Sequence, residues 1–194
     1  MATRVRQPRG YFSMTVATNQ VAIVFDCSGS MKEGSVVVPA DADGKGGASG
    51  NPFIIVKQQI VGLVKGFRGK ARFNLIAYND KVMPFKKSIT KNSKGNLKAA
   101  EAYLGKLKAK GETNLYDALM LALSDRDVDT IFLLSDGAPN RGKRTAPRDI
   151  LEGIQLANRF RKVVINTIQI GTHQEFMRLI AETNGGSYKH LKLR

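Results

Sequence analysis

The stretch VAIVFDCSGSM, residues 21–31, decides the fold. Its first six residues form an almost continuous apolar run, rich in β-branched side chains, that ends in the acid Asp26. A strand that is apolar on both faces belongs in the middle of a sheet with helices on both sides, and such sheets are usually parallel. The stretch therefore predicts a central, buried strand that ends at a carboxylate.

Similar apolar runs and helical patterns alternate along the rest of the chain. The further strand candidates are residues 72–78, 81–85, 130–136, 163–171 and 187–191. Residues 81–85 are expected to form a short antiparallel edge strand, because Pro84 cannot donate a ladder hydrogen bond. Apolar residues recur at helical spacing in residues 53–67, 96–108 and 115–124, and start signals predict two further helices over residues 146–160 and 173–183.

This alternation predicts an α/β fold with a doubly wound, mostly parallel central sheet and helices on both faces. Three helix starts carry capping signals. We expect Asn114 to cap the helix that begins at residue 115, and Thr145 to cap the helix that contains Pro147. Residues 172–175 read as a capping box for the last helix. In such a sheet, ligands bind at the carboxyl ends of the strands, near the point where the strand order reverses.

The 194 residues fit one domain, with two additions. Residues 1–19 are expected to form a basic arm, partly extended, and residues 20–194 the domain itself. Residues 32–52, rich in Gly, Ala and Asp, are expected to form a mobile surface insertion. No apolar run is long enough for a membrane span. A single cysteine, Cys27, excludes an intramolecular disulfide, and the sequence assigns no compartment.

The net charge of +15 comes from 31 basic and 16 acidic residues. Residues 81–110 hold nine lysines against one acid, Glu101. Such an excess favours an anionic partner, which could be a nucleic acid, an acidic membrane surface or an acidic protein. The alternative interpretation is that the lysines are solvated helix faces that keep the protein soluble.

Two hydroxyls follow Asp26 at alternate positions, Ser28 and Ser30. In extended geometry the three side chains project to the same side, whereas Cys27 faces the core. Hard oxygen donors of this kind suit Mg²⁺, Ca²⁺ or Mn²⁺. Two further segments can add donors, since Thr113 lies in a loop just before a helix and Asp136 ends the apolar run TIFLLSD.

The order Asp-x-Ser-x-Ser, then a loop Thr, then a strand-terminal Ser-Asp-Gly resembles the von Willebrand factor A family, most closely its bacterial members. By element order the likeness covers roughly residues 20–190. The resemblance implies a metal-ion-dependent adhesion site made of Asp26, Ser28, Ser30, Thr113 and Asp136. It implies one divalent cation, Mg²⁺ before Ca²⁺ or Mn²⁺, with one coordination position left open.

The function expected from this resemblance is metal-bridged protein binding without catalysis. Two carboxylates roughly balance a divalent ion, which can then accept a third from an Asp or Glu of a partner protein. Two other functions stay open. One is an electrostatic nucleic-acid-binding domain, which has the charge but lacks an RNA-recognition or helix-turn-helix motif. The other is a metal-dependent hydrolase, which has oxygen ligands but no obvious general base.

Overall fold

The computed structural model describes residues 12, 14, 19–40, 47–67 and 70–194. Its main sheet has the strand order β5-β4-β1-β7-β8-β9, and β6 also pairs with β4. The strands of this sheet are β1 (Gln20–Asp26), β4 (Arg72–Tyr78), β5 (Val82–Pro84), β6 (Thr90–Lys91), β7 (Thr130–Ser135), β8 (Val164–Ile170) and β9 (Tyr188–Leu191). The helices are α1 (Pro52–Gly66), α2 (Lys94–Lys106), α3 (Leu115–Ser124), α4 (Pro147–Asn158) and α5 (Glu175–Thr183).

The central strand β1 pairs in parallel with β4 on one side and with β7 on the other. The chain first adds β4 and its antiparallel neighbours, then returns across β1 to add β7, β8 and β9 in parallel. The strand order therefore reverses between β1 and β7. The predicted doubly wound fold is confirmed, and Asp26 ends a strand at the reversal point, where ligand crevices form.

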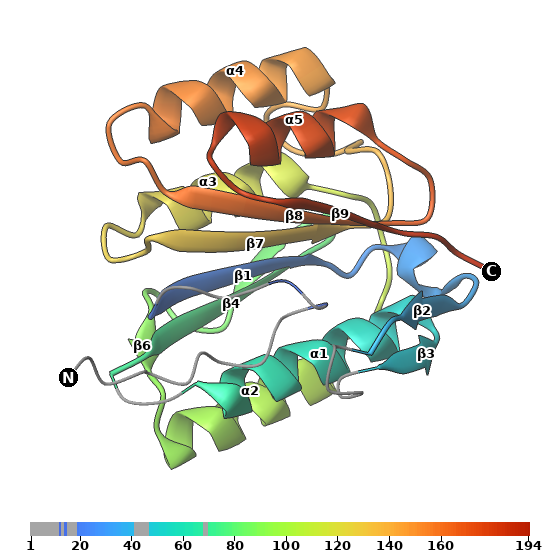
Figure 1. The fold of residues 1–194 in the computed structure, drawn as a ribbon, viewed down its shortest axis with the longest axis vertical. Helices are drawn as coiled ribbons and strands as arrows, with labels where there is room; N and C mark the ends of the chain where they lie inside the picture. The colour runs from blue at the N-terminus through green and yellow to red at the C-terminus, as the bar shows by residue number, and fades with distance from the viewer. Residues whose placement is uncertain (1–11, 13, 15–18, 41–46, 68–69) are drawn as a thin grey trace.

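Helices cover both faces of the sheet (Figure 1). Alternate side chains of β1 serve two separate cores. Ile23 and Phe25 pack in the cluster that includes Val56 of α1, while Ala22 and Val24 pack in the cluster of α3, α4 and α5. Burial on both faces explains why the strand sequence is an almost continuous apolar run.

The structure corrects two of the three predicted helix starts. The Asn114 side chain accepts a hydrogen bond from the Asp117 amide and caps α3, as predicted. The cap residue of α4 is Ala146 instead of Thr145, and it makes no side-chain cap hydrogen bond. The predicted capping box of α5 is wrong, because Gln174 is the cap residue and its side chain does not bond the helix. Proline at the start of α4 fixes the first turn without a capping side chain.

Part of the predicted insertion, residues 32–52, is regular structure. The 3₁₀ turn η1 (Gly29–Lys32) leads into β2 (Val36–Val38), which pairs antiparallel with β3 (Ala48–Gly50). Residues 41–46, between these strands, lie outside the described residues. Val36 and Val38 are buried, so the pair packs on the domain instead of standing free. Of the predicted arm, residues 12, 14 and 19 are described, and Phe12 and Met14 are buried.

Candidate metal centre

Asp26 lies at the carboxyl end of β1, fully buried, between two neighbouring strand ends. One carboxylate oxygen, Oδ1, accepts a hydrogen bond of 2.8 Å from the Ser28 amide. The other, Oδ2, accepts one of 2.9 Å from the Ser135 hydroxyl, at the end of β7. These two bonds fix the orientation of the carboxylate and leave its remaining lone pairs for another partner.

The hydroxyls of Ser28 and Ser30 and the carboxylate of Asp136 form a chain beside it. The Ser28 and Ser30 hydroxyl oxygens lie 3.1 Å apart, and the Ser30 hydroxyl donates to Oδ1 of Asp136 over 3.0 Å. The extended geometry expected from Asp26 to Ser30 does not persist, because Gly29–Lys32 form a 3₁₀ turn. The turn still brings the second hydroxyl back next to the first, so four of the five predicted oxygen-bearing residues are joined by hydrogen bonds.

The loop before α3 is fixed to the same edge by backbone hydrogen bonds. The Gly29 amide donates to the Gly111 carbonyl over 2.9 Å, and the Lys110 amide donates to the Cys27 carbonyl over 2.9 Å. Thr113 lies two residues after Gly111 and is almost fully buried. Its amide donates to the Asn140 side chain over 2.8 Å, and its carbonyl accepts from the Asn140 amide. The first two bonds hold the Thr113 loop against the residues that follow Asp26. The bonds with Asn140 hold it against the loop that follows Asp136.

Gly111 is required for this approach of the loops. Its φ of +79° lies in the region that favours glycine, and a Cβ there would come within 2.0 Å of the Asp80 carboxylate. Asp80 in turn accepts a hydrogen bond from the Glu112 amide. A larger residue at position 111 would push the loop that carries Thr113 away from β4.

The surroundings of the two carboxylates disfavour their ionised forms. Burial, reinforced by the charge of Asp136, raises the pKa of Asp26 to about 7. Burial also raises the pKa of Asp136, and Glu33 contributes. Within the described ranges, neither carboxylate forms an ion pair with a Lys, Arg or His. A buried carboxylate and a half-buried one nearby, without a basic partner, favour a bound cation, which would restore the ionised forms.

The donor set selects the kind of cation. Across the part of the chain that the structure describes, no three His, Cys, Asp or Glu side chains gather to hold a metal. The candidate centre instead combines two carboxylates with neutral hydroxyls, a hard-oxygen set with a formal charge of −2. This set fits a single hard divalent ion such as Mg²⁺ and gives it no soft ligand. The Cys27 thiol points away and donates to the Tyr78 carbonyl in the core.

Sequence reasoning missed two residues that position the site. Ser135 bonds both Asp26 and the Gly137 carbonyl, and Asn140 holds the Thr113 backbone. Ser135 directly precedes Asp136, so its place at the strand end was a usable signal. Asn140 lies in the loop GAPNRG, and its contact with a segment 27 residues away gives no local signature.

The two histidines lie elsewhere on this edge of the sheet. His173 precedes α5, and its Nδ1 is 2.7 Å from the Tyr188 hydroxyl. Nε2 of His190 is 2.6 Å from the Gly171 carbonyl, and the two imidazole rings are 5.6 Å apart. Nε2 of His173 is 3.3 Å from Oε2 of Glu175 in α5, and neither histidine forms a hydrogen bond with Asp26 or Asp136 within the described residues.

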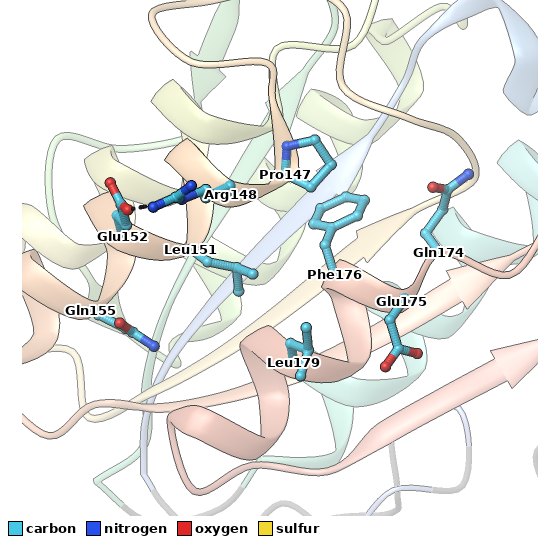
Figure 2. Close-up of a pocket in the computed structure, with 9 residues that line it drawn as sticks. All are labelled: Pro147, Arg148, Leu151, Glu152, Gln155, Gln174, Glu175, Phe176 and Leu179. Atoms are coloured by element: carbon cyan, nitrogen blue, oxygen red, sulfur yellow. Dashed lines mark hydrogen bonds and ion pairs between the residues drawn. The ribbon is translucent and has the colours of Figure 1, made fainter.

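A separate hollow of about 420 Å³ lies between α4 and α5 (Figure 2). Leu151, Phe176 and Leu179 point into it, and the ion pair of Arg148 with Glu152 lies on its rim. None of the five predicted residues lines it. Its apolar floor and paired charges offer no group for metal binding or catalysis.

Comparison with known proteins identifies the family. The model of the von Willebrand factor type A domain matches residues 34–190. The chain belongs to this family. The matched range contains Thr113 and Asp136 and begins just after the Asp-x-Ser-x-Ser segment.

Two human proteins are related in sequence to this von Willebrand factor A domain. Von Willebrand factor A domain-containing protein 3B of Homo sapiens is 24% identical over 139 residues, which are 69% of this chain and 10% of that protein. Protein 3A of the same name is 26% identical over 181 residues, which are 90% of this chain and 13% of that protein. The chain thus spans about a tenth of the length of these relatives.

Solved structures share the fold of this domain. The von Willebrand factor type A structure from Catenulispora acidiphila aligns with a TM-score of 0.70 at 20% identity, over 91% of this chain and 39% of that one. Proximal thread matrix protein 1 from the mussel byssus, with a zinc occupied MIDAS motif, aligns with a TM-score of 0.59 at 20% identity, over 88% and 40%. The manganese-loaded TRAP protein of Plasmodium vivax gives a TM-score of 0.53 at 21% identity, over 84% and 63%.

No described helix is both long and apolar enough to cross a bilayer.

Proposed function

We propose that this domain is a divalent-cation-dependent protein-binding module. Asp26, Ser28, Ser30, Thr113 and Asp136 would together hold one ion, Mg²⁺ most readily, with Ca²⁺ or Mn²⁺ as alternatives. A partner protein would complete the coordination with the carboxylate of an Asp or Glu. The observation that carries the proposal is the buried Asp26 carboxylate close to the half-buried Asp136 carboxylate, joined to two hydroxyls and without a basic partner among the described residues.

The electrostatics explain why the ligand of such a site would be acidic. A bound divalent ion would carry two positive charges, and the two carboxylates offset these without leaving an excess of negative charge. Neutral donors from Ser28, Ser30 and Thr113 add no negative charge, so a further carboxylate is still attracted. Ser135 and the Ser28 amide hold Asp26 in one orientation, which keeps the site arranged before the partner arrives.

Two relatives in fold support the metal part of this proposal. The mussel byssus protein has a zinc occupied MIDAS motif, and the TRAP protein is manganese-loaded. The likeness to the domain from Catenulispora acidiphila supports a bacterial-type member. The proposal assigns the site binding without turnover. Hydrolysis of a phosphate ester that needs Mg²⁺ and is lost in Asp26→Ala would contradict that part.

Manganese binding tests the site directly, because Mn²⁺ can be followed by electron paramagnetic resonance. The protein is titrated with Mn²⁺ alone, and Asp26→Ala is compared with Asp149→Ala, which removes an exposed acid on α4. We expect Asp26→Ala to lose binding and Asp149→Ala to keep it. Equal affinity of the two variants would refute the site.

A second step tests the open position. Relaxation of water protons by protein-bound Mn²⁺ is measured while a short glycine peptide with one central Glu is added. The matched peptide carries Gln instead. We expect the Glu peptide alone to displace water from the ion and lower the relaxation. Identical curves for the two peptides would contradict carboxylate capture even if the metal binds.

A further inference from the structure

The positive charge of the domain is concentrated in one part of the chain. Residues 52–110 contain 14 basic and two acidic residues, so they carry +12 of the total +15. Residues 111–194 contain 12 basic and 10 acidic residues. In the described structure, the first part has one internal ion pair, Lys65 with Glu101, whereas Arg141, Arg148 and Arg178 of the second part each pair with an acid.

Nine lysines of the basic part form two rows, and all nine are exposed. The first row follows the β4 edge of the sheet through β5 and β6, and the second follows α2 and the loop after it. The rows consist of Lys81, Lys86, Lys87, Lys91, Lys94, Lys98, Lys106, Lys108 and Lys110. None of the nine forms an ion pair within the described residues. We call this surface the lysine face.

The two rows are packed side by side. The Tyr103 hydroxyl of α2 donates to the Met83 carbonyl of β5 over 2.5 Å, and the rings of Tyr103 and Phe85 are 5.5 Å apart. At the other end, the Asn96 side chain donates to the Lys91 carbonyl and the Thr90 hydroxyl. These contacts hold α2 against the edge of the sheet that carries the first row.

The lysine face starts at the metal centre. Val82 of β5 lies beside Tyr78, which itself lies beside Asp26, whereas Lys91 of β6 lies beside Arg72 at the opposite end of β4. The second row returns along α2 and ends at Lys110, whose amide bonds the Cys27 carbonyl. Seven strand residues or 13 helical residues span about 20 Å. The face therefore runs from the site along the whole length of the sheet.

Two acids near this junction, Asp80 and Glu112, each have a partner outside the lysine face. Asp80 accepts the Glu112 amide, and Glu112 pairs with Arg141 over 3.5 Å. Lysines that repel one another over such a length reduce the stability of the domain, and an anionic partner removes that repulsion. Since one end of the face is a site that favours a carboxylate, the partner that fits both is an acidic peptide segment.

We propose that the lysine face binds an extended acidic segment of a partner protein, about seven residues long, whose leading Asp or Glu completes the metal centre. An extended chain advances about 3.3 Å per residue, so seven residues cover the face. This inference rests on the proposed function, because it takes one carboxylate of the segment to the ion. A nucleic acid would bind the same lysines through its phosphates, so it is tested below as a competing partner.

Fluorescence anisotropy with two labelled peptides tests the inference. One peptide is a run of nine Glu, and the other has a single N-terminal Glu followed by eight alternating Gly and Ser. The face variant is Lys87→Glu/Lys94→Glu/Lys98→Glu, and the matched control is Lys143→Glu/Arg159→Glu/Lys192→Glu. All six positions are exposed, and both variants change the net charge equally. Each is measured in Mg²⁺ and in chelator, with circular dichroism to verify folding.

We expect the nine-Glu peptide to bind in Mg²⁺ at least tenfold more tightly than the single-Glu peptide. The face variant should lose that advantage, the control should lose less than threefold, and chelator should weaken both peptides. Equal loss in the two variants, with the chelator effect intact, would overturn the lysine face and leave the proposed function standing. Loss in the face variant without any chelator effect would overturn both.

Two further probes separate other anionic partners. A nine-nucleotide oligothymidylate and vesicles containing phosphatidylserine are tested under the same conditions. Binding of either one as tight as that of the nine-Glu peptide and lost in the face variant would contradict the inference, with or without an effect of chelator. The expected result is that both probes bind weakly and lose affinity steeply with salt.

Discussion

Two regions of this domain carry unbalanced charge, and they differ in burial. The metal centre holds the buried carboxylate of Asp26 and the half-buried one of Asp136, without a basic partner in the described structure. The lysine face holds nine exposed cations against one acid, Glu101. The same kind of imbalance has a large energetic consequence in the first region and a small one in the second, because water screens exposed charges and does not reach buried ones.

The comparison shows what offsets the net charge of each region. A buried anionic centre needs a small cation that can enter between three loops. Water already solvates the exposed lysine face, so the domain does not need an anionic partner there in order to fold. The face would instead increase the affinity of the domain for such a partner. Four predictions test this difference, from the largest expected effect to the smallest.

Loss of Asp26 should have the largest effect. We expect Asp26→Ala to weaken Mn²⁺ binding at least 100-fold, or about 2.8 kcal/mol, because the ion loses half of its compensating charge. Ser135→Ala should weaken binding by about tenfold, since it removes a bond that orients Asp26. Calorimetric titration measures both. A larger loss in Ser135→Ala than in Asp26→Ala would mean that the ion lies elsewhere.

The metal-free protein should become less stable as pH rises from about 4 to 7. The pKa of Asp26 is about 7 in the folded state, against 3.8 as its ordinary value. In this window the unfolded chain releases the proton and the folded chain keeps it, so ionisation favours unfolding, by on the order of 2–4 kcal/mol. Urea denaturation in chelator at several pH values measures the slope.

Asp26→Asn is the control for that slope, because it keeps the shape and removes the charge. It should flatten the pH dependence and make the metal-free protein more stable than the wild type at pH 8. Saturating Mg²⁺ should stabilise the wild type and not the variant. A wild-type stability that rises with pH across this window would contradict the buried, uncompensated carboxylate.

Gly111→Ala should destabilise the protein by about 1–3 kcal/mol, because φ is +79° and the new Cβ meets the Asp80 carboxylate. Adding Asp80→Ala should recover part of the loss and leave the backbone strain. Gly105→Ala is the control, since it lies in α2 with open space around it and should stabilise slightly. Thermal denaturation separates the three. Equal behaviour of Gly105→Ala and Gly111→Ala would contradict the tight loop.

Single changes on the lysine face should have the smallest effect on stability. Lys94 is the first residue of α2, so Lys94→Glu relieves repulsion and places an acid at the helix N-terminus. We expect a gain of about 0.3–1 kcal/mol at low salt that shrinks in 1 M salt. Lys106 lies in the last turn of α2, where an acid is unfavourable. Lys106→Glu should therefore change stability by less, because this cost opposes the relief of repulsion between lysines. A loss of more than 1 kcal/mol of stability in Lys94→Glu would mean that the lysine face stabilises the folded domain.

The fold could be predicted because its signals are local. Residues 115–124 and 72–78 were placed with the bounds that the structure has, since burial on one helix face or on both strand faces dictates the residue pattern. The helix starts at Thr145 and at residues 172–175 were wrong. A capping residue contributes only about 1 kcal/mol, so the packing of a helix can begin it elsewhere. The small pair β2–β3 was missed because each strand has only three residues.

The candidate site was predicted as a set of residues and not as a geometry. The order of Asp26, Ser28, Ser30, Thr113 and Asp136 was visible in the chain, but the reason given for Ser30 was wrong, because a 3₁₀ turn replaces the strand there. Ser135 and Asn140 act through contacts with distant segments, and such contacts leave no periodic pattern in a single sequence.

The sequence by itself determined the alternating strands and helices, the acid at the end of the central strand and the excess of lysine in residues 52–110, since composition and periodicity are properties of the chain. Only the tertiary structure decided that Asp136 lies within one hydrogen bond of Ser30, and that the lysines form two adjacent rows beginning at the metal centre. Both depend on the pairing of β1 with β4 and β7, which joins residues 50 to 110 positions apart.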